Sequence, residues 1–300
     1  MIAGARGAGA FPRMRASGSI FQTPWHRMPR PHSDQLPTTR MFSEIKKLPA
    51  YRELIINFAM REIKAKYKQA ALGVSWAVLQ PLLQILIMTL VFSVFARVPS
   101  EGIPYPLFLF TGLLPWLFFA NALNRGTTAL TNQAGLITKI YFPRESLVIA
   151  GLVASLVDFA IAASIYVVML IYYGVSLSPY ALMAIPIFLV QMILVFGLML
   201  LLAPLNAFYR DVSQLMPVLI TFWQYLTPIM YPLKMVPARY QALYSLNPMV
   251  GIMDGYRSVL LRHQMPDMNL LAYAFGVGIV LLVFGYSQFK RVEMKLADIA

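Results

Sequence analysis

Few residues in this sequence have the types and spacing that chemistry needs. It contains no cysteine, so neither disulfides nor thiolate metal sites can form. The three histidines, His26, His32 and His263, are too scattered in sequence to suggest a metal cluster. The phosphate-binding pattern G-x-x-x-x-G-K-[ST] is absent, which argues against ATP hydrolysis of the usual kind. We therefore expect no enzyme activity, no metal site and no cofactor on this chain.

Asp158 is the one carboxylate deep within a long apolar stretch. A buried acid in a membrane helix is a functional candidate, either as a proton relay or as the partner of another helix. Ser155 and Ser164 lie nearby in sequence, and we favour a hydrogen bond to a neighbouring helix. One acid is thin support for a proton-driven carrier.

Aromatic and amide side chains suggest a second chemistry, the binding of sugars. The C–H faces of sugar rings stack on aromatic rings, and sugar hydroxyls bond to polar edges. Trp76, Trp223 and Tyr225 could serve in this way, although an aromatic belt at the membrane surface is the alternative. Gln80 and Gln84 are four residues apart and share one helix face, which should look inward because amides are costly in lipid. Bridging between helices is the alternative for these glutamines.

The composition defines the class of protein that must position these side chains. Of the 300 residues, 59% are hydrophobic and 12% are charged, whereas a soluble domain has about 25% charged residues. We therefore expect an all-α integral membrane protein. The net charge of +13 reports topology and contact with anionic lipid rather than nucleic-acid binding.

Six apolar stretches are long enough to cross a bilayer. Of the 25 Lys and Arg residues, 20 fall on the side that carries both termini, which predicts that both termini are cytoplasmic. We expect a multi-pass protein of the cytoplasmic membrane with spans at about 70–96, 106–123, 147–173, 182–208, 215–230 and 270–286.

The N-terminal region divides into a tail and a helix. Residues 1–42 are rich in Gly, Pro, Ser and Arg and are predicted to be a disordered basic tail, so the membrane domain would be residues 43–300. Met41 is an alternative start. Residues 51–66 place apolar side chains at helical spacing beside Arg52, Arg61, Lys64 and Lys66, which predicts an amphipathic helix at the membrane surface.

Two connections between spans have a pattern of their own. In the polar loop at about 125–145, apolar residues recur at one-turn spacing from Leu136 to Tyr141, and Pro143 should stop this short helix. A soluble partner could grip such a segment, or it could simply re-enter the membrane surface. In the segment 232–267, Asn247 and Pro248 form a good helix start. We expect two short re-entrant helices there, between the fifth and sixth spans.

Four stretches resemble one family in the expected order. LGVSWAVLQPLLQ begins at Leu72, LITKIYFPRE at Leu136, FYRDVSQLMPVLITFWQYLTPIMYP at Phe208 and LNPMVGIMDGYRSVLL at Leu246. Together these stretches resemble the ATP-binding-cassette type-2 export permeases, in the branch that exports O-antigen polysaccharide and teichoic acid. Residues 1–42 show no such resemblance.

The resemblance implies a homodimer around a continuous channel, with two copies of a separate ATPase that carries the ATP and Mg²⁺. The cargo would be a polyprenyl-diphosphate-linked polysaccharide such as O-antigen, capsule or teichoic acid. The implied ATPase-coupling loop contains Gly135, Leu136, Lys139, Tyr141, Arg144 and Glu145, and the diphosphate would meet Arg52, Arg61, Lys64 and Lys66. The implied channel lining is Trp76, Gln80, Gln84, Trp223 and Tyr225, and the exit gate contains Tyr256 and Arg257.

Three other functions are alternatives. The first is a type-2 exporter of small lipids or drugs. The second is a membrane-embedded glycosyl- or phosphoglycosyltransferase, which would need clustered acids or a metal site that this sequence lacks. The third is a passive channel, which should conduct without an ATPase.

Overall fold

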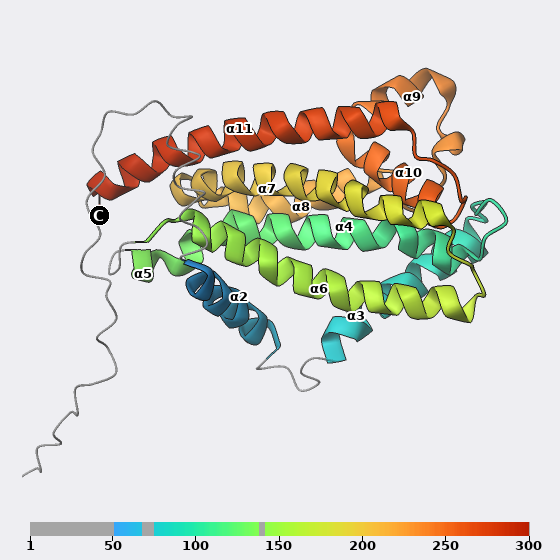
Figure 1. The fold of residues 1–300 in the computed structure, drawn as a ribbon, viewed down its shortest axis with the longest axis horizontal. Coiled ribbons are helices and arrows are strands. Elements are labelled where there is room, and N and C mark those ends of the chain that lie inside the picture. The colour runs from blue at the N-terminus through green and yellow to red at the C-terminus, as the bar shows by residue number, and fades with distance from the viewer. Residues whose placement is uncertain (1–50, 68–74, 138–141, 300) are drawn as a thin grey trace, which may run out of the picture. The chain divides into compact units, whose positions relative to one another are not determined.

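All regular elements in the described part of the chain are helices. The computed structural model describes residues 51–67, 75–137 and 142–299, so the predicted tail and residues Lys139 and Tyr141 lie outside it. Five helices in these ranges are long and apolar enough to cross a membrane, which defines a multi-pass membrane protein (Figure 1). They are α3 (Trp76–Thr89) with its π-helical continuation η3 (Leu90–Phe95), α4 (Tyr105–Thr128), α6 (Glu145–Tyr172), α7 (Ala184–Phe208) with the preceding η5 (Pro179–Met183), and α11 (Met268–Ile299).

The remaining helices are shorter. The helix predicted at 51–66 is present as α2, and the helix start predicted at Asn247 is confirmed, because the Asn247 side chain accepts a hydrogen bond from the Met249 amide at 3.0 Å. The predicted fifth span corresponds to α8, whose 15 residues are fewer than those of the five longer helices. The shorter helices are α2 (Arg52–Tyr67), η4 (Thr131–Gln133), α5 (Ala134–Ile137), α8 (Asp211–Tyr225), η6 (Leu233–Met235), α9 (Ala238–Ser245) and α10 (Pro248–Leu260).

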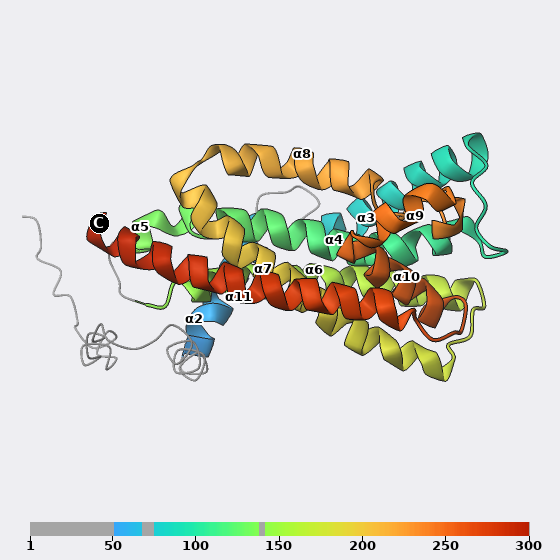
Figure 2. The same cartoon turned by 90° about the horizontal axis from the view of Figure 1, so that it is seen from above.

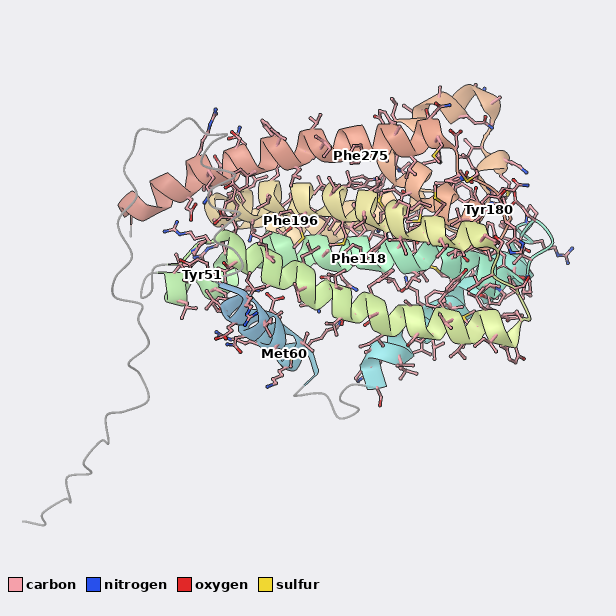
Figure 3. The ribbon with its side chains drawn as sticks, in the orientation of Figure 1. Tyr51, Met60, Phe118, Tyr180, Phe196 and Phe275 are labelled. Carbon is pink, nitrogen blue, oxygen red and sulfur yellow. The ribbon has the colours of Figure 1, made fainter. Side chains whose placement is uncertain are left out.

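α4 is the centre of the bundle. It packs against α3, α6, α7, α8 and α10, and 78% of its most apolar segment is buried. A helix that is apolar on all sides is expected in such a position. Its largest side chains, among them Trp116 and Phe118, are almost fully buried, and Figure 3 shows Phe118 in the middle of the bundle.

α7 and α11 approach each other most closely, because glycines face the contact. A Cβ atom on Gly197 would lie 2.6 Å from the Leu282 nitrogen, and one on Gly285 would lie 2.5 Å from the Gly197 carbonyl oxygen. Small residues allow such close backbone approach in membrane helices, where lipid gives no hydrophobic drive to association. The two helices therefore form one tightly packed pair.

In contrast, α3 and α8 lie at the edge of the bundle. Only 11% of the span formed by α3 and η3 is buried, and Figure 2 shows α8 and α3 along the same edge. Both helices carry large apolar side chains that the rest of the chain leaves exposed, including Leu86, Ile87, Val94, Phe95, Leu215, Val218, Phe222 and Tyr225.

The connections collect at two opposite ends of the bundle (Figure 1). One end holds the start of α2, α5, the start of α6 and the end of α11. The other end holds residues 96–104, the turn after α8, and helices α9 and α10. The loops with candidate functions are thus separated by the length of the spanning helices.

Candidate functional site

Asp158 joins three helices. Its carboxylate accepts hydrogen bonds from the Arg125 Nη2 atom on α4 and from the Lys66 Nζ atom on α2, each at 2.8 Å. Arg125 also donates to the Ser155 hydroxyl at 3.1 Å and lies 3.8 Å from the Glu62 carboxylate. The hypothesis that Asp158 is a partner of a neighbouring helix is confirmed, with arginine and lysine as donors.

Burial and the neighbouring Arg125 have opposite effects on the pKa of Glu62. Burial raises the pKa of this α2 carboxyl above its ordinary value, and the charge of Arg125 opposes the rise. The Glu62 Oε2 atom has no hydrogen-bond partner among the described residues. The network thus combines two cations with two acids where α2 meets α4 and α6.

A small cavity lined by both polar and apolar side chains adjoins this network. Its volume is about 50 Å³, and its lining comes from α2, α3, α4 and α6. Gln80 and Gln84 both border it, beside Asn121, Lys66 and Asp158. These two glutamines therefore border the cavity from one side of α3, where Gln80 is exposed and Gln84 is half-buried.

The predicted coupling loop and α2 form one surface. The Arg61 guanidinium donates to the Gln133 side chain at 3.1 Å, and the rings of Phe58 and Phe142 are 5.7 Å apart. Gly135 is exposed and Leu136 is half-buried, whereas Arg52 and Lys64 are exposed on α2. Figure 3 shows Met60 on the outer side of the same helix.

Arg144 and Glu145 connect the start of α6 to the end of α11. The Arg144 amide donates to the Glu293 side chain at 3.4 Å, and its guanidinium donates to the Glu293 carbonyl at 3.3 Å. Lys290 bridges the carboxylates of Glu145 and Glu293. Two predicted loop residues are therefore anchored to the last helix of the protein.

The predicted lining residues on α3 and α8 point in different directions. Trp223 turns into the bundle, where its indole donates to the Asn247 side chain at 3.0 Å and its ring lies 5.0 Å from the Phe119 ring. Tyr225 and Trp76 lie on the exposed faces of their helices. Contact with a cargo stays a prediction for all three.

The predicted gate residues are both buried on α10. The Tyr256 hydroxyl donates to the Gln191 side chain at 3.4 Å, and the Arg257 guanidinium donates to backbone carbonyls of the turn after α8. Only 1% of Arg257 is exposed. Their role in a gate stays a prediction, and direct contact between Arg257 and a passing molecule would require this packing to open.

Gln191 is a buried polar residue that the sequence analysis missed. It lies on α7, donates to the Pro115 carbonyl of α4 at 2.7 Å and accepts from Tyr256 of α10, so it joins three helices. The sequence could have revealed Gln191, because an amide in the middle of an apolar span is expected to face other helices, as was argued for Gln80 and Gln84.

Charges at the opposite end of the bundle form a partly exposed network. Arg262 donates to Glu101 and to Asp254, each at 2.8 Å, and Lys234 lies 3.6 Å from Glu101. Burial acts to raise the pKa of Glu101, but the hydrogen bond and charge of Arg262 outweigh it and hold that pKa below its ordinary value. This network ties residues 96–104 to the end of α10.

The charged side chains described above join helices and loops to one another. Within residues 51–67, 75–137 and 142–299, no group of three or more His, Cys, Asp or Glu side chains could hold a metal ion. Largely buried ion pairs, five long apolar helices and uncovered apolar helix faces define a helical integral membrane protein.

Comparison with known proteins identifies the family. The model of the ABC-2 type transporter family matches residues 53–261, so the chain belongs to this family. It is 31% identical to the O-antigen export system permease protein RfbA of Myxococcus xanthus, over 86% of this chain and 99% of that protein.

More distant relatives carry related names. An O-antigen export system permease protein RfbA of Klebsiella pneumoniae is 28% identical over 82% of this chain and 95% of its own length. The polysialic acid transport protein KpsM of Escherichia coli is 22% identical over 78% of this chain and 91% of its own length.

Proposed function

We propose that this chain is the membrane permease subunit of an ATP-driven exporter that moves a polyprenyl-diphosphate-linked polysaccharide of the O-antigen type across the cytoplasmic membrane. The observation that carries the proposal is the match over nearly the whole spanning region to permeases named for O-antigen export. The chain itself would form the path, and ATP with Mg²⁺ would bind to a separate partner subunit.

A homodimer accounts for the uncovered helix faces. α3 and α8 lie on one edge of the bundle, and their exposed apolar side chains have no cover within the described chain. A second copy related by a twofold axis would bury both faces and enclose a channel between them. Trp76 and Tyr225 would then lie on the channel side, and Trp223 would support α8 from behind.

The chain would cross the membrane six times if α8 and the turn after it together form one span. α8 lies beside α4 and returns the chain from the end of α7 to the end that holds α9. Both termini would then be cytoplasmic, in agreement with the excess of Lys and Arg on that side. α2 would lie at the inner surface, and α9 and α10 would re-enter the outer leaflet and form the exit gate.

The lipid diphosphate would be bound at the inner surface by the exposed cations of α2. Arg52, Arg61 and Lys64 are exposed, and a basic residue near anionic headgroups contributes about 1 kcal/mol. Lys66 belongs to the predicted set, but its ion pair with Asp158 also gives it a structural role.

The partner ATPase would contact α2 and the coupling loop together. The Arg61–Gln133 hydrogen bond and the Phe58–Phe142 contact make these segments one surface. Arg144, which follows Phe142 closely in the chain, is hydrogen-bonded to the end of α11. Force applied there would therefore reach two spanning helices, α6 and α11.

The test is ATPase activity in lipid vesicles, measured for this chain alone and after co-purification with a candidate partner ATPase. We expect a stable complex whose ATP hydrolysis changes in the Arg61→Ala and Arg144→Ala variants. Arg210→Ala, which changes an exposed cation between α7 and α8, is the matched control. If no ATPase associates and the chain alone conducts ions or turns over a lipid-linked sugar, the exporter function is wrong.

A further inference from the structure

The turn after α8 is an irregular stretch of backbone in a buried position. The helix ends at Tyr225, the Thr227 amide makes one last bond back to the Gln224 carbonyl at 3.3 Å, and the chain then runs irregularly to η6. Residues 227–230 are fully buried. In apolar surroundings, carbonyl groups that a helix no longer pairs need other donors.

Side chains from two other helices supply those donors. The Arg257 Nη1 atom donates to the carbonyls of Pro228 at 2.6 Å and Tyr231 at 3.1 Å, and Nη2 donates to that of Ile229 at 2.5 Å. The Tyr105 hydroxyl donates to the Met230 carbonyl at 2.7 Å. Four successive carbonyls are thus paired by one residue of α10 and one of α4.

The guanidinium fits closely into its pocket. Its central carbon lies 4.0 Å from the centre of the Phe108 ring, a favourable arrangement for a cation. A Cβ atom on Gly112 would lie 3.1 Å from Nη2 and 3.4 Å from the Ile229 carbonyl oxygen. Glycine is unfavourable inside a helix, so its presence in α4 at this point leaves the space that Arg257 occupies.

The partners of Arg257 are chemically unusual for a buried cation. Its hydrogen bonds within the described residues go to backbone carbonyls alone, whereas Arg262, five residues later, pairs with the carboxylates of Glu101 and Asp254. A planar fork of donors can hold several oxygens in one fixed arrangement, which a lysine cannot reproduce. This arrangement therefore fixes the turn relative to both α10 and α4.

We propose that Arg257 is the positioning residue of the exit: it fixes the turn Thr227–Tyr231 at the outer end of α8 and thereby keeps the transport path closed between transport cycles. The inference rests on the proposed function, in which the exposed face of α8 borders the channel. Arg257 acts through the turn and does not touch the cargo. The turn can then move only together with α10.

The chain has no cysteine, so a single reporter can be introduced into the full-length protein. Met230→Cys places a thiol in the turn, and its reaction rate with a membrane-impermeant maleimide measures how often the turn opens. We expect slow labelling with Arg257 present and labelling about tenfold faster in Arg257→Gln, because local opening costs less once the carbonyls lose their donor. Arg257→Lys keeps the charge but loses the fork, and should also label faster.

Two further variants control this measurement. Arg262→Gln removes an arginine near the same helix end without touching the turn, and should label as slowly as the parent. Gly112→Ala should speed labelling when Arg257 is present and add nothing in Arg257→Gln, because its Cβ then has no guanidinium to displace. Parent-like labelling in both Arg257 variants, or an additive effect of Gly112→Ala, would overturn the proposal.

Ion leak separates positioning of the exit from general support of the fold. In vesicles without ATP, Arg257→Gln of unchanged oligomeric state should leak more potassium than the parent. A folded variant that labels quickly but leaks no more than the parent would overturn the gating role. Glycan export by the parent complex tests the proposed function separately, because neither labelling nor leak depends on the identity of the cargo.

Discussion

Arg125 and Arg257 are two largely buried arginines with different kinds of hydrogen-bond partner. Both are arginines held among apolar helices, and both join at least two helices. Arg125, near one end of α4, pairs with the carboxylates of Asp158 and Glu62. Arg257, near the other end of the bundle, pairs with three backbone carbonyls. The first arrangement is an ion-pair network, and the second is a cap on irregular backbone.

The difference lies in what remains when the arginine is removed. Asp158 would keep the ammonium group of Lys66 at 2.8 Å, and a carboxylate in apolar surroundings can also take up a proton. The carbonyl groups held by Arg257 would keep no such partner, and a carbonyl cannot take up a proton in place of the lost donor. The ion-pair network should therefore tolerate substitution better than the carbonyl cap.

The largest effect is expected for Arg257→Leu. The change leaves the carbonyls of Pro228, Ile229 and Tyr231 without their donor in a largely buried turn. Each buried polar group left unpaired costs about 1–3 kcal/mol, so we expect the loss of the donor to three carbonyls to cost at least about 3 kcal/mol. Thermal unfolding in detergent, compared with the parent and with Arg262→Leu as control, measures it. Equal losses for the two leucine variants would contradict the special role of Arg257.

A smaller effect is expected for Arg125→Leu. Asp158 keeps Lys66 as a partner, so the loss should be about 1–2 kcal/mol, near the cost of one unsatisfied buried group. Asp158→Asn in the same background should then cost less than it does alone, because the two residues act as a pair. A double-mutant cycle of thermal stabilities measures this coupling, and strict additivity would show that the pair contributes nothing.

The smallest effect concerns Glu101 and depends on pH. Its pKa in the folded protein lies below the ordinary value of 4.5, so it stabilises the fold above pH 4.5 and this contribution is lost as pH falls through the folded pKa. The pair with Arg262 is partly exposed, which limits the effect to about 0.5 kcal/mol. Glu101→Gln should flatten the decline of thermal stability below pH 4.5, and an unchanged decline would exclude this pair as its source.

Much of the fold could be predicted because membrane helices have strong local signals. Long apolar stretches predicted α3, α4, α6, α7 and α11, and the Asn247–Pro248 pair marked the start of α10 correctly. The end of α8 was placed about five residues too late. Pro228 lies in an apolar run there, and the local pattern did not reveal that a distant arginine allows the backbone to leave the helix early.

The partners of the charged residues could not be predicted from sequence. Arg125 counted only as a charge in the topology argument, and Arg257 was named only for the gate that the resemblance implies. The sequence does not show whether an arginine near a helix end points to water or into the bundle. Asp158 was recognised by its apolar neighbours, but its bond to Lys66 spans 92 positions in the chain. Such contacts depend on how helices pack, which local spacing does not encode.

The close contact with α7 should make α11 behave as a rigid rod. α11 has 32 residues, and at 1.5 Å per residue it is about 48 Å long, well beyond the ~30 Å core of a bilayer. Its last turns hold Arg144 and Glu145, whereas a Cβ atom on Gly251 of α10 would lie 2.7 Å from the Leu270 carbonyl oxygen at its beginning. In the middle of α11, Gly285 and the facing Gly197 hold its backbone in direct contact with that of α7. We therefore expect a tilt imposed at one end of α11 to displace α10, and with it Arg257, at the other.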